Sequence, residues 1–188
     1  MLFLLIACSD VEDVNHDHHD HEVITTVKLN VVDLEDFEQV FTWADPELDG
    51  EPVVDSISFR LDQSYQVSVS FWNELENPAE DLTQEILDES SEHQVFFGGD
   101  LYNIDEAGLL DHAYTDQDER GNPIGVENTL DGVALGEGIL SIGLRHLPDE
   151  DGAQMKTSAL WSDWLENGEA NLAGDWDAMV EFPIEVTE

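Results

Sequence analysis

Basic residues are scarce in this sequence. Only 5 of its 188 residues are Lys or Arg, against 45 Asp and Glu, which gives a formal net charge of −40 and a pI near 4.1. Proteins bind nucleic acids and anionic membrane surfaces through clusters of Lys and Arg that contact phosphate groups. The sequence therefore excludes nucleic acid as a partner, and it leaves a lipid anchor as the only expected attachment to a membrane.

Cysteine and long hydrophobic runs are nearly absent. The one cysteine, Cys8, excludes an intramolecular disulfide, and no later segment is long and apolar enough to span a bilayer. Cys8 ends the apolar run MLFLLIAC, whose last four residues resemble a bacterial lipobox, in which a lipidated cysteine becomes the mature N-terminus. No Lys or Arg precedes Cys8, and the seven residues before it are at the lower limit for a secretory signal. We therefore interpret residues 1–8 as a truncated lipoprotein signal segment, with Cys8 as the lipidation site.

Sequence motifs that support catalysis are missing as well. The chain has no GxSxG or HExxH motif, no Gly-rich phosphate-binding loop and no second cysteine to act as a nucleophile. Paired carboxylates for glycoside hydrolysis cannot be recognised, because 45 acidic residues provide every spacing by chance. We predict that the protein is not an enzyme, and a hydrolase is the least favoured class.

The excess of acidic residues has two explanations. A charge of −40 destabilises a compact chain by self-repulsion, which salt relieves by shortening the Debye length to roughly 3 Å at 1 M. The protein is expected either to work in a salt-rich medium, as halophilic proteins do, or to neutralise part of its surface with divalent cations. The acids are spread along the whole chain, which favours the first explanation.

The apolar pattern divides the chain into a tether and a domain. Residues 9–22 are acidic and histidine-rich, without apolar periodicity, which is typical of a flexible tether. From Val23 onward the pattern is that of short strands in which apolar and polar residues alternate. The clearest alternation predicts a shared core face for four residues: Tyr65, Val67, Val69 and Phe71.

These strands predict an all-β fold for residues 23–188, namely an antiparallel, immunoglobulin-like β-sandwich. One short helix is expected at about residues 79–91, where Asn77 and Pro78 precede an acidic first turn. The expected strands lie at residues 23–31, 40–44, 57–61, 65–72, 94–97, 112–115, 126–130, 139–146 and 179–186.

Several short motifs between about Glu22 and Glu188 carry a resemblance to a known family. They lie at residues 71–74, 78–83, 92–97, 114–118, 121–125 and 144–148. In these motifs the chain resembles small lipoproteins of Gram-negative bacteria that are labelled "type 1 periplasmic binding fold superfamily protein". The resemblance implies no assigned activity, and it suggests an association with outer-membrane uptake receptors. The family label implies an α/β fold, whereas the alternation of residues favours the all-β fold.

The densest group of metal-ligating side chains lies in the tether. His16, His18, His19 and His21 are interleaved with Asp17 and Asp20. Neutral imidazole is a good ligand for zinc and other transition metals, and carboxylates can complete the shell. The segment is expected to bind such an ion loosely, to pass it to the domain or to a partner, or to serve as a hydrophilic spacer.

Two acidic turns are candidates for calcium. Asp45, Glu47 and Asp49 are followed by Gly50, so that oxygen ligands stand at positions one, three and five, as in a calcium loop. Asp116 and Asp118 begin a similar turn that ends at Gly121. Ordinary β-turn chemistry explains both patterns equally, since Asp, Asn and Gly favour turns.

Two histidines of the domain are candidates for fixed chemistry. His93 stands beside Glu92 near the expected end of the helix, and His146 ends an expected strand. A histidine with a carboxylate can bind a metal ion or move a proton, whereas either ring can also satisfy backbone groups at the edge of a sheet.

Taken together, these features predict a non-enzymatic lipoprotein of the cell envelope, anchored in the outer membrane and facing either the periplasm or the surface. We expect it to bind a divalent metal ion or to assist an outer-membrane receptor in metal uptake. The alternative is a carbohydrate-binding or adhesion module of the cell surface, with Trp161 and Trp164 as an exposed ligand patch.

Overall fold

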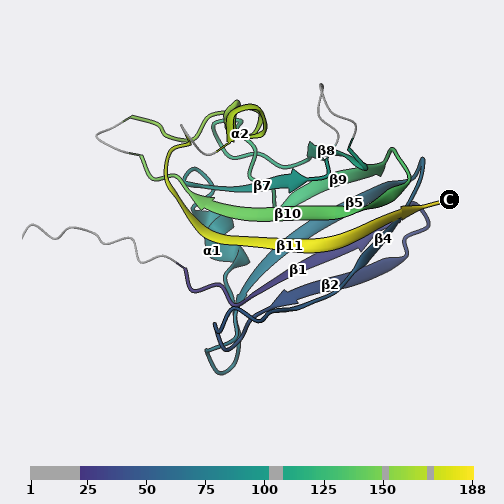
Figure 1. Ribbon diagram of the computed structural model, residues 1–188. Helices are drawn as coiled ribbons and strands as arrows, with labels where there is room; N and C mark the ends of the chain where they lie inside the picture. The colour runs from purple at the N-terminus through teal and green to yellow at the C-terminus, as the bar shows by residue number, and fades with distance from the viewer. Residues whose placement is uncertain (1–21, 102–107, 150–152, 169–171) are drawn as a thin grey trace, which may run out of the picture.

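The fold is a β-sandwich in which two sheets face each other, as Figure 1 shows. The computed structural model describes residues 22–101, 108–149, 153–168 and 172–188. Within these residues there are eleven strands and two short helices, so the all-β prediction is confirmed. Neither helix of this part of the chain is long and apolar enough to cross a lipid bilayer.

The larger sheet has seven strands, and all of its pairings are antiparallel. Its central strand β5 pairs with β1 on one side and with β9 on the other, while β6 adds a short pairing at its end. In spatial order the strands are β3 (Val53–Val54), β2 (Glu38–Ala44), β1 (Thr26–Val32), β5 (Ser64–Asn73), β9 (Glu127–Gly132) and β8 (Leu110–Tyr114), with β6 (Glu80–Asp81) beside β5.

The smaller sheet has four strands, and it contains the one pairing that departs from the expected pattern. In spatial order the strands are β4 (Ile57–Arg60), β11 (Asp175–Thr187), β10 (Gly136–His146) and β7 (His93–Gly99). The edge strand β4 pairs in parallel with β11, whereas the other neighbours are antiparallel. The domain is therefore a mixed sandwich rather than a purely antiparallel one.

The core lies between the two sheets, on the faces that the alternation predicts. In β5, Tyr65, Val67, Val69 and Phe71 are 8%, 1%, 1% and 0% exposed. They belong to one apolar cluster with residues of the smaller sheet, such as Phe182 of β11. Burying each such side chain contributes about 1.5–3 kcal/mol relative to leaving it in water.

Helix α1 (Thr83–Asp88) lies inside the predicted range of residues 79–91 but is shorter. Strand β6 occupies residues 80 and 81, so the chain enters the helix only after Leu82. The helix begins at Thr83 rather than near residue 79, because residues 80 and 81 pair with β5 and this pairing outweighs the local preference of the segment for a helix. Ile86 is fully buried and anchors α1 to the core.

A second helix, α2 (Leu160–Asn167), covers part of the outer face of the smaller sheet (Figure 1). Its Trp164 packs edge-on against Phe96 of β7, with ring centroids 5.6 Å apart. Gly98 leaves room for this contact, because a Cβ atom at that position would lie 2.5 Å from the Trp164 ring. The outer face therefore has a small apolar cluster of its own, which consists of Phe96, Leu147 and Leu160 with partly buried neighbours such as Trp164 and Trp176.

One of the five basic residues is fully buried. The Nζ atom of Lys156 donates a 2.6 Å hydrogen bond to the carbonyl of Ser90, and it lies 3.2 Å from Oδ2 of Asp118. Burial lowers the pKa of Lys156, and the neighbouring carboxylate opposes this shift. Through these two contacts, Lys156 joins its own segment to those of Ser90 and Asp118, which are distant in sequence.

Replacing Lys156 with Met should destabilise the domain by about 3 kcal/mol, because Asp118 would keep a buried charge without its cation. Lys28 is the matched control, since its side chain is 30% exposed and its Nζ atom lies 4.0 Å from Oε1 of Glu74. Lys28→Met should cost about 1 kcal/mol or less. Denaturant unfolding of both variants measures the difference, and equal losses would contradict a structural role for the buried pair.

Candidate metal site

Two neighbouring strands bring His93 and His146 together. In the antiparallel pairing of β7 and β10, these two residues stand directly opposite each other. Their rings stack with centroids 4.7 Å apart and planes 8° from parallel, and the two residues are 0% and 5% exposed. The sequence identifies both histidines as candidates, but it is the register of β7 and β10 that places them side by side.

The site lies at one end of the space between the sheets. His93 continues the inward-facing series of Val95 and Phe97 in β7, and His146 continues that of Leu144 in β10. Helix α1 leads directly into β7, because the N–H of Glu92 donates a 2.8 Å hydrogen bond to the carbonyl of Glu89. The two histidine rings therefore belong to strands β7 and β10, and the C-terminal end of α1 places Glu89 beside the His93 ring.

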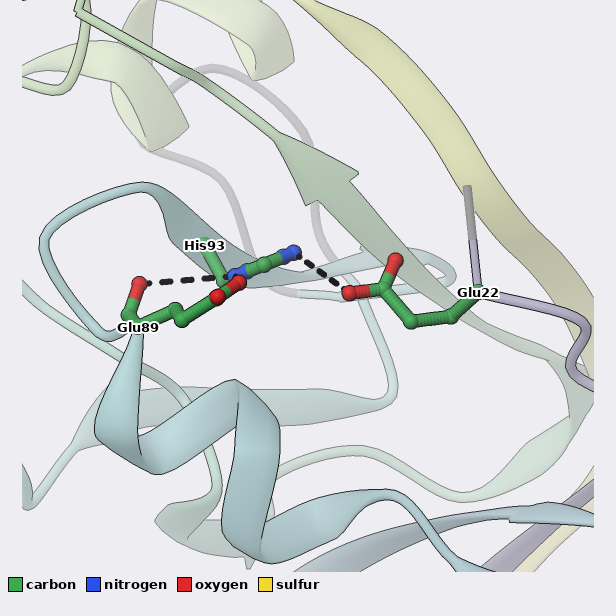
Figure 2. Close-up of side chains that lie close together, drawn as sticks. All are labelled: Glu22, Glu89 and His93. Atoms are coloured by element: carbon green, nitrogen blue, oxygen red, sulfur yellow. Dashed lines mark hydrogen bonds and ion pairs between the residues drawn. The ribbon is translucent and has the colours of Figure 1, made fainter. Parts of the chain in front are cut away.

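Carboxylates approach His93 from opposite edges of its ring, as Figure 2 shows. Oε1 of Glu22 lies 3.2 Å from Nε2, and Oε2 of Glu89 lies 3.8 Å from Nδ1. Oδ2 of Asp177 lies 4.0 Å from Nε2. A further acid, Glu92, has an oxygen 3.9 Å from Nε2 of His146.

A β-bulge positions Asp177. The register between β10 and β11 shifts after Leu144, which pairs with Ala178, while Arg145 pairs with Trp176. Asp177 is therefore the extra residue of the bulge, and a bulge re-aims side chains that strict alternation would send elsewhere. Its side chain is fully buried and reaches the His93 edge of the site.

Glu22 and His93 form a charged pair. Burial alone would raise the pKa of Glu22, but its short polar contact with His93 and the charge of that ring outweigh burial and lower the pKa. Burial likewise opposes a charge on His93, yet Glu22, Asp177 and the carbonyl of Glu89 together raise the pKa of this imidazole. The ring is therefore held as an imidazolium to higher pH than a free histidine.

The polar groups of this pair are incompletely satisfied by the described residues. The Glu22 side chain is only 10% exposed, and its Oε2 atom has no hydrogen-bond partner within the described part of the chain. Nε2 of His93 also lacks an aligned hydrogen bond, so its 3.2 Å approach to Glu22 is an ion pair rather than a linear hydrogen bond. Buried polar atoms normally have partners, and exceptions mark places where an ion or a water molecule can bind or where the group has a functional role.

These residues form a set that could hold a metal ion. Glu22, Glu89 and His93 each offer a ligand atom, and the three atoms lie within 4.8 Å of one another. One imidazole and two carboxylates match the ligands of divalent transition metals. Among the described residues this is the single group of three such side chains at that spacing.

The carboxylates of the acidic turns accept hydrogen bonds from backbone N–H groups. Asp45 accepts hydrogen bonds from the N–H groups of Asp49 and Gly50, at 3.1 and 2.9 Å. Asp116 similarly accepts from the N–H groups of Gly125 and Glu127. Carboxylates engaged in this way shape turns, so calcium binding at the acidic turns stays a prediction without a ligand group around it.

Asp118 belongs to the buried pair with Lys156 rather than to a group of calcium ligands. Its Oδ1 atom accepts hydrogen bonds from the N–H groups of Arg120 and Asn122, and its Oδ2 atom faces Lys156. Burial works against ionisation, yet the N–H groups and Lys156 together lower the pKa of Asp118. Its charge is therefore already compensated by groups of the protein.

Trp161 and Trp164, the two residues of the expected ligand patch, are both half-buried and contact the domain. The indole N–H of Trp161 donates a 2.8 Å hydrogen bond to the carbonyl of Phe97, and its ring packs beside Tyr114. Trp164 packs on Phe96 and Trp176. Both tryptophans therefore lie on the side of α2 that packs on the domain, and a ligand patch at their exposed parts stays a prediction.

The remaining sequence candidates lie outside the described residues. They are Cys8 and the four tether histidines, His16, His18, His19 and His21. Glu22, which the sequence assigned to the end of the tether, is the first described residue and is part of the site. Glu89 and Asp177 were missed as well, and the one available signal was the spacing of four residues between Glu89 and His93 at a helix end.

Comparison with known proteins adds no family. The chain matches no protein-family model and no curated protein. Among solved structures, domains 4 and 5 of the S-layer protein SbsC align with 86% of this chain and 77% of that chain, at 10% identity and a TM-score of 0.30. A likeness this weak carries no argument about function.

The charged pair predicts a window of pH in which it stabilises the fold. The lowered pKa of Glu22 gives stability that is present above 4.5 and is lost as the pH falls through the folded value. The raised pKa of His93 gives stability that is complete below 6.5 and is lost as the pH rises through the folded value. The difference in unfolding free energy between wild type and Glu22→Gln should therefore be largest between pH 4.5 and 6.5.

Glu89→Gln is the control for that measurement, because the Glu89 side chain is 49% exposed and lies farther from the ring. It should change stability less and with a weaker pH dependence. Urea unfolding at several pH values and constant salt gives both differences. A Glu22→Gln effect that does not vary with pH would contradict the ion pair.

His112 predicts a second pH effect, away from the site. Burial lowers its pKa to about 4, against the smaller opposing effect of a 3.0 Å hydrogen bond with Asn128. The unfolded chain then binds a proton between pH 6.5 and 4 that the folded domain does not, so stability should fall by on the order of 3 kcal/mol over this range. His112→Gln should flatten that slope in pH-dependent unfolding, and an unchanged slope would contradict the assignment.

Proposed function

We propose that this protein binds a divalent transition-metal ion, zinc in the first instance, through His93, Glu22 and Glu89. The observation that carries the proposal is the convergence of one buried imidazole and two carboxylates within 4.8 Å. The charge of the cluster supports it, since the carboxylates around His93 outnumber the single positive charge on the ring.

Metal binding at this site must compete with a proton. An imidazole binds a metal ion only through a free lone pair, and the raised pKa of His93 means that the ring carries a proton on each nitrogen over a wider pH range. An incoming cation would take the place of one proton and keep Glu22 neutralised. The charged pair is therefore a resting state that a metal ion can replace without leaving a buried carboxylate unpaired.

The two carboxylates face different nitrogens of the ring, so they cannot both reach one ion without movement. Zinc binds nitrogen and carboxylate oxygen at about 2.0–2.2 Å, which requires the ligand atoms to draw closer than they stand. Glu89 is half-exposed and free to turn toward the solvent, whereas Glu22 is nearly buried against Nε2. Glu22 and His93 are accordingly the primary ligands, and Glu89 is the weaker one.

The proposed setting is the cell envelope. The lipobox-like residues at 5–8 support lipidation at Cys8, and the strongly acidic composition supports a role in a salt-rich or cation-rich medium. A lipid-anchored protein that binds metal could serve an outer-membrane receptor for metal uptake. The alternative of a carbohydrate-binding module is less favoured, because Trp161 and Trp164 are partly buried against the domain.

Isothermal titration of zinc chloride into the full chain tests the proposal. Wild type should bind zinc at the site and release protons, which titration in two buffers of different ionisation enthalpy would count. Affinity should fall at least tenfold in His93→Gln and in Glu22→Gln, and less in Glu89→Gln. Glu85→Gln is the matched control, since Glu85 is an exposed acid on α1 outside the site.

Two outcomes would overturn the proposal. One is the absence of zinc binding to the folded wild-type protein. The other is binding whose affinity does not change in either His93→Gln or Glu22→Gln, once circular dichroism has shown that both variants are folded.

A further inference from the structure

The buried pair of Lys156 and Asp118 has the arrangement of two groups that can react with each other. An amine and a carboxyl group condense to an amide with loss of water, and their surroundings decide whether they do so. The Nζ atom of Lys156 lies 3.2 Å from Oδ2 of Asp118, and both side chains are 0% exposed. The carboxyl carbon is one bond away from that oxygen, so the nitrogen stands close to the atom that it would attack.

Burial favours the uncharged form of the amine and keeps water away from the pair. It lowers the pKa of Lys156, so the neutral amine, which is the nucleophile, is easier to reach than in an exposed lysine. Burial also opposes ionisation of Asp118, yet the N–H group of Asn122 and the charge of Lys156 outweigh it and lower the pKa of Asp118. The ion pair is therefore the resting state, and a reaction that starts from it is slow.

Two hydrogen-bond donors hold the second oxygen of Asp118. Its Oδ1 atom accepts hydrogen bonds from the N–H groups of Arg120 and Asn122, at 2.9 and 2.8 Å. Attack on the carboxyl carbon would move negative charge onto this oxygen, and backbone N–H groups at such distances stabilise an oxyanion. The turn that fixes Asp118 thus also supplies the donors that the reaction requires.

The carbonyl of Ser90 fixes the amine from another side. It accepts a 2.6 Å hydrogen bond from Nζ of Lys156. This hydrogen bond occupies one proton of the ammonium, which the nitrogen keeps when it becomes an amide N–H. The other two protons are available to the departing oxygen, and the first of them can cross the 3.2 Å contact to Oδ2 of Asp118.

We propose that Lys156 and Asp118 form an isopeptide bond in the folded protein. A bond forms between Nζ of Lys156 and Cγ of Asp118, and the bond between Cγ and Oδ2 breaks. Oδ2 leaves as one molecule of water with two protons of the former ammonium, Oδ1 becomes the amide oxygen, and the third proton stays on the nitrogen. The reaction balances without an oxidant or any other co-reactant, and it removes two buried charges.

The bond would join parts of the domain that are distant in sequence. Asp118 lies between β8 and β9 of the larger sheet, and Lys156 lies between β10 and α2. The amide would tie the larger sheet to the segment that leads into the helix on the outer face of the smaller sheet. Unlike the ion pair, this connection would persist in denaturant.

Trypsin digestion of the denatured full-length protein, followed by mass spectrometry, tests the proposal. Trypsin cleaves after Lys and Arg, of which the chain has only 5. Without the bond, residues 61–120 and residues 146–156 appear as separate peptides. With the bond, cleavage at Lys156 is blocked, and residues 61–120 and 146–188 appear as one branched species that is lighter than the two free peptides by one water molecule.

Folded protein and matched variants complete the test. Wild type refolded from urea should accumulate the branched species over days, whereas the same chain kept in urea should not. Lys156→Arg keeps a cation beside Asp118 but should give separate peptides, and Lys28→Arg, which changes the other lysine, should leave the branched species in place.

Two results would overturn the inference. One is folded wild-type protein that still gives separate peptides after prolonged incubation. The other is a cross-link that persists in Lys156→Arg. The digest involves neither zinc nor His93, so its result is independent of the proposed function.

Discussion

The contact between Glu22 and His93 is the interaction on which the account of this protein depends. It joins the start of the described chain to the first residue of β7, across a distance of 3.2 Å and in a nearly buried setting. Burial disfavours each charge alone, and each group is charged because the other is. In a chain with 45 acids and 5 basic residues, a histidine that carries a proton is a rare internal cation, and the residues around it form a group that could hold a metal ion.

Three further features of the sandwich surround His93 in this contact. The register of β7 and β10 stacks His146 on His93, the end of α1 supplies Glu89, and the bulge in β11 turns Asp177 inward. The Glu89–His93 pair is local in sequence, whereas the register and the bulge depend on strands that are far apart in the chain. The complete site therefore forms only when the domain is folded.

Sequence reasoning predicted the sandwich because alternation is a direct consequence of a sheet with one buried face, as the four core residues of β5 show. It named His93 and His146 but could not pair them, since pairing depends on the register of strands far apart in the chain. It placed Glu22 in the tether because no apolar pattern precedes Val23, and it could not foresee Asp177, because a bulge breaks the alternation. The packing contacts of Trp161 and Trp164 could not be foreseen for a related reason: spacing of three residues identifies one face of a helix, but not how far that face is covered.

The most direct test of the central claim is the titration of the His93 ring by nitrogen-15 nuclear magnetic resonance, with and without zinc. Without metal, the ring should lose its proton at a pH above 6.5, the ordinary value for histidine. With saturating zinc at neutral pH, the imidazolium signal should be replaced by that of a metal-bound ring. A ring that titrates below 6.5 and ignores zinc would contradict both the charged pair and the metal site.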